Sequence, residues 1–549
     1  MQMKVDECKH LNKLYALPVI VYLVIAGQYL SRPGLYYDEV FWLNAAVGSP
    51  CENFFSITVE NIPFPVMVMP YIGALKSWVY SIPLAIFGTS VWAIRGVALC
   101  FGSIILILLW RYLKRYLSAL WCMGVCMLLA TDPAFVYCTR IDSGPIAIML
   151  ICKLAAVSCL GRYLESGKVR YLYLCGVSLF VGLYDKANFS WYYVAFILSA
   201  LLVYGSTLWK HLRDKPGRSI IAYAILGGIS LAVGFTYLVP LFVGDSAGGE
   251  MKFQIERVLG VLRSAFSGGG CYEMYFGIPT DSLSILWPVF MISLVLCPVL
   301  SLFAIRKKKN VCLAQIGLFE AVSTLILMVC MALTTSFGGA HHAIMIYPAP
   351  QIMLVISCVL IKELLPWKKQ LTQGFTIIVC LIVSVSGIVC IHSYLLRFRE
   401  NNLYTPMWDP AIYELGEYVS EHPSDYLLAV DWGIATQMIA MSEDNSNRKK
   451  ILDMWPTFIE YDVTSSEWLK NTFFIGQKTV VLAHSEASSQ FQQAQAGWLQ
   501  FLEDSALAPA EKTIINGAGG EPLFTCYYFD LNVNFHQTGN TRRKYCIFP

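Results

Sequence analysis

Long apolar segments of about 20 residues alternate with short polar breaks along most of this chain, from Leu14 to Leu396. A helix needs about 20 mostly apolar residues to cross the hydrocarbon core of a membrane. The pattern therefore predicts eleven membrane-spanning helices, with approximate bounds 14–30, 91–110, 118–137, 143–160, 171–184, 189–208, 219–243, 282–304, 311–335, 343–361 and 372–396. The predicted fold class is a mainly α, polytopic membrane helical bundle.

The positions of lysine and arginine predict how these helices are oriented, because cytoplasmic loops hold most of these residues. Every second polar break is basic, and the basic breaks span 111–115, 162–170, 210–218, 306–309 and 362–369. Together with Lys4, Lys9 and Lys13 they place the amino terminus in the cytoplasm. The other breaks then face the exported side, and they contain Asp38–Glu39, Arg140 with Asp142, Asp185–Lys186, the loop 244–280 and His341–His342.

The segment from Pro63 to Thr89 does not cross the membrane in this prediction, since a further crossing would place the basic breaks outside. It is predicted to form juxtamembrane helices that lie in the membrane interface and are broken by Pro63, Pro65, Pro70 and Pro83. The first exported loop is then 31–90. The first apolar run is predicted to be an uncleaved anchor, because no small-residue cleavage site follows it.

The chain changes character after Leu396, where charged and polar residues return. Residues 1–396 are therefore predicted to form a transmembrane domain and residues 397–549 a small, soluble, exported α/β domain. Alternating apolar positions predict strands at 426–430, 479–483, 513–515 and 524–529, with helices at 433–441 and 490–502. Asp431–Trp432 and His484 belong to this domain, where acceptor binding and plain packing are both open.

The composition is that of a membrane protein and argues against one class of partner. The 549 residues are 56% hydrophobic and 14% charged, and the mean hydropathy is +0.55. The net charge of +3 is small and its basic residues are scattered, which argues against a nucleic-acid partner. Most of the 18 cysteines lie in predicted spans. The exported candidates for a disulfide are Cys51, Cys271, Cys526 and Cys546, and an oxidising compartment favours pairing of Cys526 with Cys546.

Four motifs on the predicted exported face resemble those of a known family. They are LYYDEVFWLNAA with Asp38–Glu39, FGTSVWAIRG with Gly88 and Arg95, PAFVYCTRIDSGPIAIML with Arg140 and Asp142, and VGLYDKANF with Lys186. In order and spacing they resemble the GT-C membrane glycosyltransferases over residues 10–400, especially the branch of protein O-mannosyltransferases and lipid A aminoarabinose transferases. Two departures are the absence of a Glu-Lys-Pro motif near Glu60 and Asp185 in place of the usual threonine.

The resemblance implies an inverting transfer of a sugar from a polyprenyl phosphate to a lipid, glycan or protein hydroxyl on the exported side. Such a transfer needs a carboxylate to accept the hydroxyl proton. Asp38 is the predicted base, with Glu39 and Asp142 as further catalytic candidates. Glu39 can instead cap the following helix, and Asp142 can instead neutralise Arg140.

The phosphate leaving group gains charge, which fixed cations would stabilise. Lys186 and Arg140 are the first candidates, although Lys186 is also explained as a lysine at a helix end. The loop 244–280 adds Lys252, Arg257 and Arg263 on a predicted amphipathic helix, with glycines 268–270 behind it as a hinge. This helix is either a lid over the lipid phosphate or a surface helix that contacts headgroups.

Substrate-binding candidates complete the predicted site. His341 and His342 adjoin each other, so at most one is expected to point into the site; a structural role is the alternative. Tyr37 either stacks on sugar or belongs to the interfacial aromatic belt. No metal is assigned; a divalent metal at the histidine pair is the alternative, and it would need further ligands.

Two other functions are compatible with a polytopic chain. A transporter would have ionisable residues near the midplane and repeated halves, whereas here they gather at one face and no repeat is present. A non-catalytic glycan-binding relative of the same fold would not need Asp38. A bacterial inner membrane is the favoured location, with the endoplasmic reticulum as the alternative.

Overall fold

The computed structural model describes residues 14–47, 55–60, 62–144, 146–214, 254–334, 338–365, 369–442 and 445–531, with 221, 225, 227 and 228. These residues divide into two compact units. The helical unit extends to Pro410, and the C-terminal unit begins at Ala411. Cys51, Lys252 and Cys546 lie outside the described residues, so the predicted Cys526–Cys546 pairing stays a prediction.

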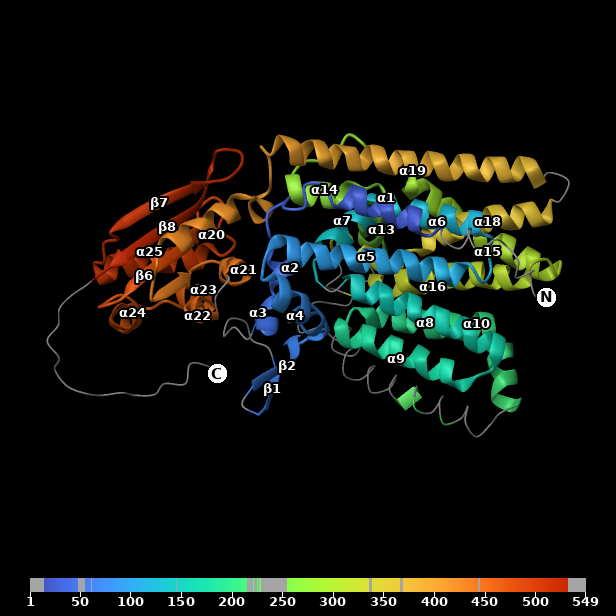
Figure 1. Ribbon diagram of the computed structural model, residues 1–549, viewed down its shortest axis with the longest axis horizontal. Coiled ribbons are helices and arrows are strands. Elements are labelled where there is room, and N and C mark those ends of the chain that lie inside the picture. Colours follow the sequence, from blue (N-terminus) through green and yellow to red (C-terminus); the bar gives the residue numbers. More distant parts are fainter. Residues whose placement is uncertain are drawn as a thin grey trace. The chain divides into compact units, whose positions relative to one another are not determined.

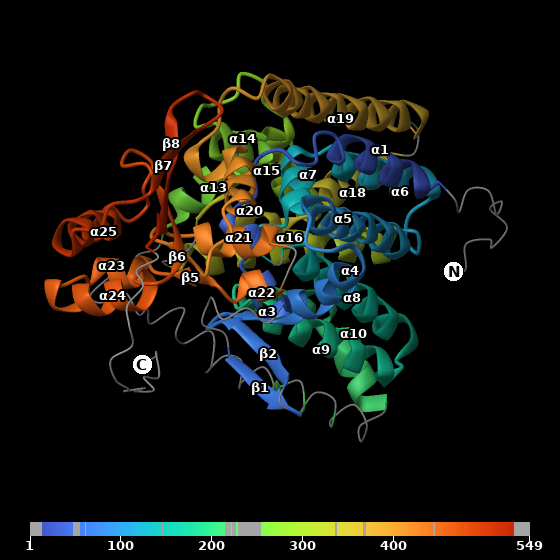
Figure 2. The same ribbon diagram turned by 60° about the vertical axis from the view of Figure 1, so that its left-hand side comes forward.

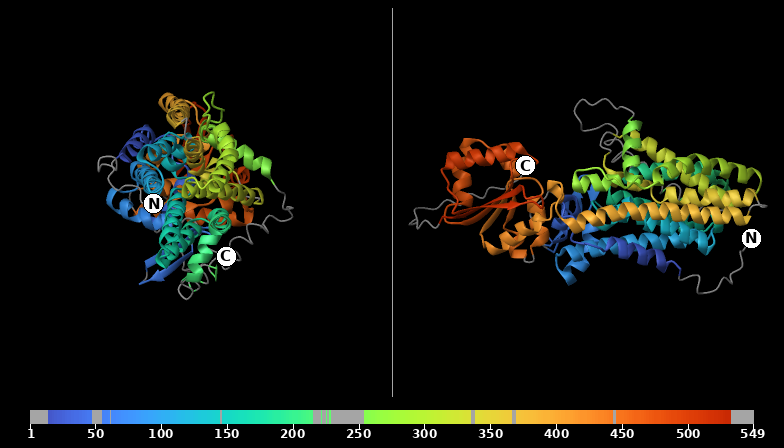
Figure 3. Two further views of the ribbon diagram at one scale, coloured as in Figure 1. Left: turned by 90° about the vertical axis from the view of Figure 1, so that its right-hand side faces the viewer. Right: turned by 90° about the horizontal axis from the view of Figure 1, so that it is seen from above.

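Seven helices of the helical unit are long and apolar enough to cross a membrane (Figure 1). They are α5 (Val91–Leu113), α8 (Ile146–Ser166), α10 (Phe189–Asp214), α15 (Leu286–Arg306), α16 (Val311–Ala332), α18 (Ala349–Leu364) with the turn before it, and α19 (Lys369–Glu400). Figure 3 shows them end-on in its left view. The described residues therefore form an integral membrane helical bundle, which confirms the predicted fold class.

An eighth span results if α6 (Ala119–Ala130) and α7 (Pro133–Ile141) are counted together, because these helices are bent by 65° at their junction. Pro133 is the first residue of α7 and cannot continue the preceding helix. Asp132 then caps α7, since its carboxylate accepts a hydrogen bond from the Phe135 amide at 2.9 Å. The predicted span 118–137 is thus a broken one.

Helices are also present at two other predicted spans, but they are shorter. The helix α1 (Ala16–Ala26) has 11 residues and α9 (Val169–Asp185) has 17. At 1.5 Å per residue they extend about 16 and 25 Å, less than the roughly 30 Å of a hydrocarbon core. The predicted span 219–243 lies almost wholly outside the described residues.

The first loop differs from the prediction of interfacial helices over 63–89. Three strands, β1 (Phe55–Val59), β2 (Ile62–Met69) and β3 (Ile72–Gly73), form an antiparallel sheet, and only α4 (Leu75–Phe87) is helical. The prediction was wrong for the first half because Pro63 and Pro65, within β2, disfavour a helix. Two shorter helices, α2 (Tyr37–Val40) and α3 (Leu43–Val47), precede the sheet.

The amphipathic helix predicted in the loop 244–280 is present as α13 (Ile255–Phe266). Val258 and Leu262 are buried, whereas Arg257 and Arg263 are exposed. Gly268 separates it from α14 (Gly269–Phe276), and the Tyr394 hydroxyl donates a 2.6 Å hydrogen bond to the Gly268 carbonyl. This hydrogen bond fixes the backbone at Gly268, where α13 and α14 join.

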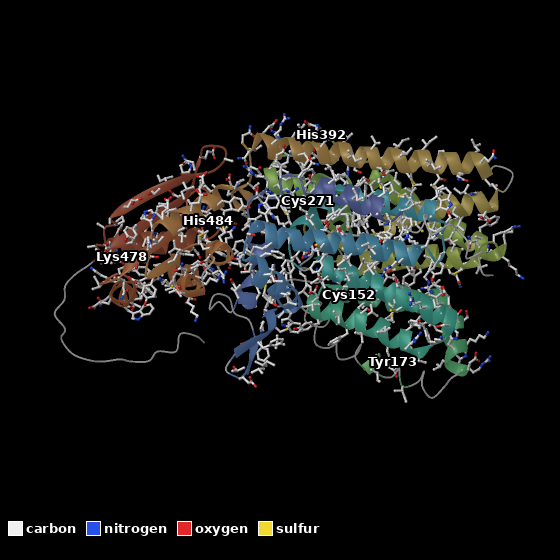
Figure 4. All side chains as sticks on the ribbon, in the orientation of Figure 1. Cys152, Tyr173, Cys271, His392, Lys478 and His484 are labelled. Atoms are coloured by element: carbon white, nitrogen blue, oxygen red, sulfur yellow. The ribbon has the colours of Figure 1, made fainter. Side chains whose placement is uncertain are left out.

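Cys271, one of the exported disulfide candidates, lies in α14 (Figure 4). Its sulfur is 3.7 Å from that of Cys138 in α7, and both side chains are buried. The contact joins α14 to α7.

The C-terminal unit is an α/β sandwich around a five-stranded sheet (Figure 2). The strand order is β5-β4-β6-β8-β7, with bounds Ile451–Asp453, Tyr426–Ala429, Lys478–His484, Pro522–Asp530 and Glu511–Asn516 in that order. The strands β5, β4 and β6 are parallel, and β8 and β7 are antiparallel. One face of this sheet packs on α23 (Trp455–Ile459), α24 (Ser466–Phe473) and α25 (Gln492–Ser505); α20 (Ala411–Glu421) and α21 (Ile434–Met441) contact β7, β4 and β5.

The sequence located four of these five strands and both of the helices that it predicted. The strand β5 was missed because it has only three residues and shows no alternation of its own. Its place at the sheet edge is set by pairing with β4.

Replacing Gly497 by alanine is expected to destabilise the C-terminal unit by about 1–3 kcal/mol, because overpacking strains a close contact. A Cβ atom at this position in α25 would lie 2.0 Å from the Phe458 carbonyl oxygen. At Gly416, in α20, the added Cβ would meet only the flexible Met441 side chain at 3.2 Å. Thermal unfolding of the full chain in detergent is expected to show a clear loss for Gly497→Ala and little change for Gly416→Ala; equal losses would contradict the packing argument.

Candidate functional site

Asp38 and Glu39 are adjacent in α2 but face different surroundings. Asp38 is partly buried and lines a cavity, whereas Glu39 is fully buried. Two neighbouring helical residues point about 100° apart, because a helix has 3.6 residues per turn. The acidic pair is therefore two separate groups with separate environments.

Glu39 forms a buried ion pair with Arg95 of α5. The Arg95 Nε and one terminal nitrogen donate to the two carboxylate oxygens at 2.6 and 2.8 Å. The remaining donors of Arg95 bind the carbonyls of Leu30, Pro33 and Gly34 at 2.8 to 3.2 Å. One guanidinium thus holds the chain from the end of the first helix to α2, and so fixes where Asp38 lies.

The cavity beside Asp38, called here the Asp38 cavity, has a volume of about 430 Å³. Its lining comes from α2, the β2–β3 turn, the start of α8, the α9–α10 connection and α17 (Ala340–Ala343). The lining residues are Asp38, Phe41, Met69, Tyr71, Ile72, Gly144, Lys186, Ala187, Asn188, Trp191, His341 and His342. Residues from five parts of the chain therefore share one chamber, and Asp38, Lys186, His341 and His342 are among the predicted site residues.

The backbone places Lys186 in this cavity at the end of α9. Lys186 is extended and pairs with Ile72, and the Ala187 amide donates to the Tyr71 carbonyl at 2.9 Å. Gly144 leaves room for the side chain, since a Cβ atom there would be 2.9 Å from Lys186 Nζ. The Gly144 amide also donates to the Asp38 carbonyl at 3.0 Å. Main-chain contacts thus hold the segments of Asp38 and Lys186 together.

Asp38 and Lys186 influence each other electrostatically. Burial raises the pKa of the Asp38 carboxyl, and the positive charges of Lys186 and Lys76 only partly offset this. Burial lowers the pKa of the Lys186 ammonium, and Asp38 and Asp185 partly offset that shift. Within the described residues, neither side chain makes a hydrogen bond or an ion pair, so both are available to a ligand.

Asp142 lies behind the cavity lining and is paired with Lys76 of α4. The Lys76 ammonium is 3.1 Å from the Asp142 carboxylate and donates to its carbonyl at 2.7 Å. The other carboxylate oxygen accepts from the Ala147 amide at 2.9 Å. Sequence reasoning missed Lys76, although a single lysine within an apolar helix is itself a signal for a buried partner.

The predicted cations other than Lys186 lie outside the cavity lining. Arg140 donates to the carbonyls of Tyr29 and Arg32, the latter at 2.8 Å. Arg257 comes near Gly338, which leads into the histidine turn, because a Cβ atom on Gly338 would be 3.2 Å from its guanidinium. Arg263 is exposed on α13. Arg140 therefore braces the first loop, and Arg257 approaches the segment that precedes the two histidines.

Both histidines of the 341–342 pair line the cavity, whereas the sequence predicted that only one would face it. Their rings are 4.2 Å apart. The helix that carries them has four residues and follows Gly339, whose φ is +77°. The His342 Nδ1 accepts from the Gly338 amide at 3.0 Å, and its ring packs edge-on against Trp191 at 5.8 Å.

Aromatic residues that the sequence did not single out supply much of the lining. Tyr37, the predicted stacking residue, is 7% exposed and stacks on Phe41 at 5.8 Å. Phe41, Tyr71 and Trp191 reach the cavity in its place. Among the described residues, no group of three or more His, Cys, Asp or Glu side chains could hold a metal ion.

The candidates in the C-terminal unit form a buried junction. The Asp431 carboxylate accepts from His484 Nδ1 at 3.0 Å and from the amides of Trp432, Gln490 and Phe491 at 2.7 to 3.3 Å. Burial alone would raise the pKa of Asp431, but these hydrogen bonds outweigh it and lower the pKa. Four donors on one carboxylate join the ends of β4 and β6 to the start of α25, which favours packing as its role.

Comparisons with known proteins agree with this architecture. A family model of dolichyl-phosphate-mannose-protein mannosyltransferases matches residues 73–238. Among solved structures, ArnT from Cupriavidus metallidurans bound to undecaprenyl phosphate aligns with a TM-score of 0.55 at 9% identity, over 95% of this chain and 97% of that chain. Its apo structure gives 0.54 at 10% identity, over 95% and 98%. No curated protein matches this chain in sequence.

The chain therefore has the GT-C fold of ArnT, and the resemblance drawn from the sequence motifs is confirmed. The family model and the fold together indicate a glycosyltransferase.

Replacing Arg95 by methionine is expected to destabilise the chain by about 3–5 kcal/mol, because it leaves the Glu39 carboxylate buried without its partner. The double variant Arg95→Met with Glu39→Leu removes both charges and is expected to regain part of this loss. Thermal unfolding in detergent gives the comparison. A double variant that is no more stable than Arg95→Met alone would contradict the assignment.

Proposed function

We propose that this protein is an inverting glycosyltransferase that moves a sugar from a polyprenyl-phosphate donor to a hydroxyl acceptor on the exported side of the membrane. The observation that carries this proposal is the Asp38 cavity, in which a carboxylate and an ammonium face one chamber without a partner among the described residues. A polyprenyl-phosphate donor is supported by the structural match to ArnT, whose solved complex contains undecaprenyl phosphate.

Each charged group of the cavity assists one half of the reaction: Asp38 assists the attack on the sugar, and Lys186 assists the departure of the phosphate. The acceptor hydroxyl oxygen attacks the anomeric carbon while Asp38 accepts its proton. The bond between that carbon and the phosphate oxygen breaks on the opposite face, which inverts the configuration. The departing polyprenyl phosphate gains negative charge, and the Lys186 ammonium stabilises it. The acceptor is a lipid, glycan or protein hydroxyl.

The raised pKa of Asp38 suits it to this role, since a carboxylate that binds protons more tightly is a stronger base. The nearby Lys186 opposes the effect of burial on this pKa and so favours the ionised form of the carboxyl. Each of the two groups therefore favours the charged form of the other.

The other predicted residues act around this pair. Glu39 and Asp142 hold α2, which carries Asp38, and α4, which carries Lys76, through their ion pairs. Arg140 braces the first loop, while Arg257 offers a second cation to the lipid phosphate from α13. His341, with its neighbour His342, borders the sugar.

The orientation belongs to the same proposal. The amino terminus is cytoplasmic, and the Asp38 cavity and the C-terminal unit are exported, in a bacterial inner membrane or in the endoplasmic reticulum. The basic breaks that carry this assignment include Arg111 and Arg115 around the end of α5, and the run from Arg306 to Lys309 that begins at the end of α15.

Asp38→Asn is expected to lower kcat for sugar transfer by about 10²- to 10⁴-fold, because asparagine cannot accept the hydroxyl proton. Purified protein with a polyprenyl-phosphate sugar and a hydroxyl acceptor provides the assay, and binding of the donor is expected to persist in the variant. Transfer that survives the substitution would overturn the assignment of the base. Wild-type protein that binds the donor without transferring sugar would favour a non-catalytic relative.

The pH profile of kcat/KM is expected to have an acidic limb that lies above the usual titration range of an aspartate. Asp38 must be ionised to act as base, so activity falls as pH drops through its raised pKa. Lys186→Met removes a charge that lowers this pKa, and the limb is then expected to move to higher pH. Lys210→Met, at the far end of α10, serves as the matched control and is expected to leave the limb in place; an unmoved limb in Lys186→Met would contradict the coupling.

A further inference from the structure

Two buried cysteine sulfurs are in contact in the helical unit, and the proposed reaction uses neither of them. Cys138 belongs to α7 and Cys271 to α14, and their sulfurs are 3.7 Å apart. The two residues are 5% and 3% exposed. Buried thiols can be simple packing, because cysteine behaves as a small apolar residue. A covalent link between the two sulfurs is the alternative.

The pair lies at the end of the bundle that the proposed orientation places outside the cytoplasm. The Cys138 carbonyl accepts a hydrogen bond from the Asp142 amide at 3.0 Å, so Cys138 is in the last turn of α7, beside the polar break at 140–142. Cys271 is the third residue of α14, within the loop 244–280. In that orientation both thiols meet an oxidising compartment, where disulfides form and persist.

The distance between the sulfurs fits a covalent link after a small movement. A disulfide bond is about 2.05 Å long, so each sulfur needs to approach the other by only about 0.8 Å. The helices α7 and α14 also pack directly on each other. The neighbouring thiol of Cys390, in α19, donates instead to the carbonyls of Ser267 and Gly268 at 3.9 and 3.7 Å. The contact between Cys138 and Cys271 is therefore the better candidate for a bond.

We propose that Cys138 and Cys271 form a disulfide that joins α14 to α7. Each thiol loses its hydrogen and the two sulfurs form one bond. Two electrons and two protons pass to the disulfide of an oxidase protein, which is reduced to two thiols. The exchange takes place while the chain folds, since both thiols are buried afterwards. The inference rests on the proposed orientation and does not depend on sugar transfer.

The link would fix a helix that supports the segment of Asp38. Tyr275 of α14 packs on Trp408 with ring centroids 4.7 Å apart, and Trp408 stacks on Tyr36 at 4.3 Å. Tyr36 directly precedes α2, which carries Asp38. A disulfide from α14 to α7 thus strengthens the packing behind α2, and it excludes α14 from any movement of a lid.

The test is a chymotryptic digest of the full-length protein, isolated from membranes without reductant and with its free thiols alkylated in denaturant. Chymotrypsin cleaves after Tyr137 and Tyr272, which directly flank the two cysteines, so mass spectrometry can identify the linked peptides. These peptides are expected in wild-type and in Cys390→Ala protein, and they are expected to separate on reduction. The buried Cys122 of α6 is expected to be alkylated, which excludes artificial oxidation of the sample.

Thermal unfolding gives a second measurement. Reductant is expected to lower the Tm of the wild type by about 5 °C or more, because a disulfide restricts the unfolded chain. Cys138→Ala cannot form the link, so the same reductant is expected to lower its Tm by less. An equal shift in both proteins would contradict the proposal. Cys271→Ala replaces this variant if it does not fold, and the digest of the wild type needs no variant.

The outcomes separate this inference from the proposed function. Alkylation of both cysteines in the wild type, or their recovery in links to other cysteines, would overturn the disulfide. Oxidation of a fresh sample by copper–phenanthroline then identifies the cause: a link that forms only with this oxidant contradicts the proposed orientation, and no link at all contradicts the packing of α14 on α7. Sugar transfer, assayed on the same sample, reports on the glycosyltransferase assignment independently.

Discussion

The buried ion pair between Arg95 and Glu39 is the constraint on which the site depends. A charge inside a protein is costly unless it is paired and fully hydrogen-bonded, and Arg95 meets this demand with both Glu39 oxygens and three carbonyls of the first loop. The loop therefore has one position relative to α5. Asp38, the residue before Glu39, is directed to the cavity because Glu39 is held by Arg95.

A second constraint concerns the charges that the cavity keeps unpaired. Asp38 and Lys186 are close enough to shift each other's pKa but make no ion pair with each other. A direct contact would satisfy both groups and leave little for a substrate. Their separation leaves a carboxylate and an ammonium that no ion pair stabilises, which is common at sites that bind and transform a charged ligand.

The sequence predicted the fold class and brought Asp38, Lys186 and both histidines to one face, because hydropathy and the distribution of basic residues determine which breaks share a side of the membrane. It could not separate Asp38 from Glu39, since that difference depends on Arg95, 56 positions away. Lys76 was also missed. Its importance comes from its burial beside Asp142, and burial is set by contacts between distant segments.

Gly144 affects how the lining of the cavity could change in evolution. Its amide holds the Asp38 carbonyl, and its missing side chain leaves space for Lys186. Main-chain atoms thus position the Asp38 carboxylate and the Lys186 ammonium, and these atoms do not change when a neighbouring side chain is replaced. Residues of the lining such as Phe41 and Trp191 can then change without moving the two groups, so under the proposed function such a chamber can take new sugars or acceptors after a few substitutions in its lining.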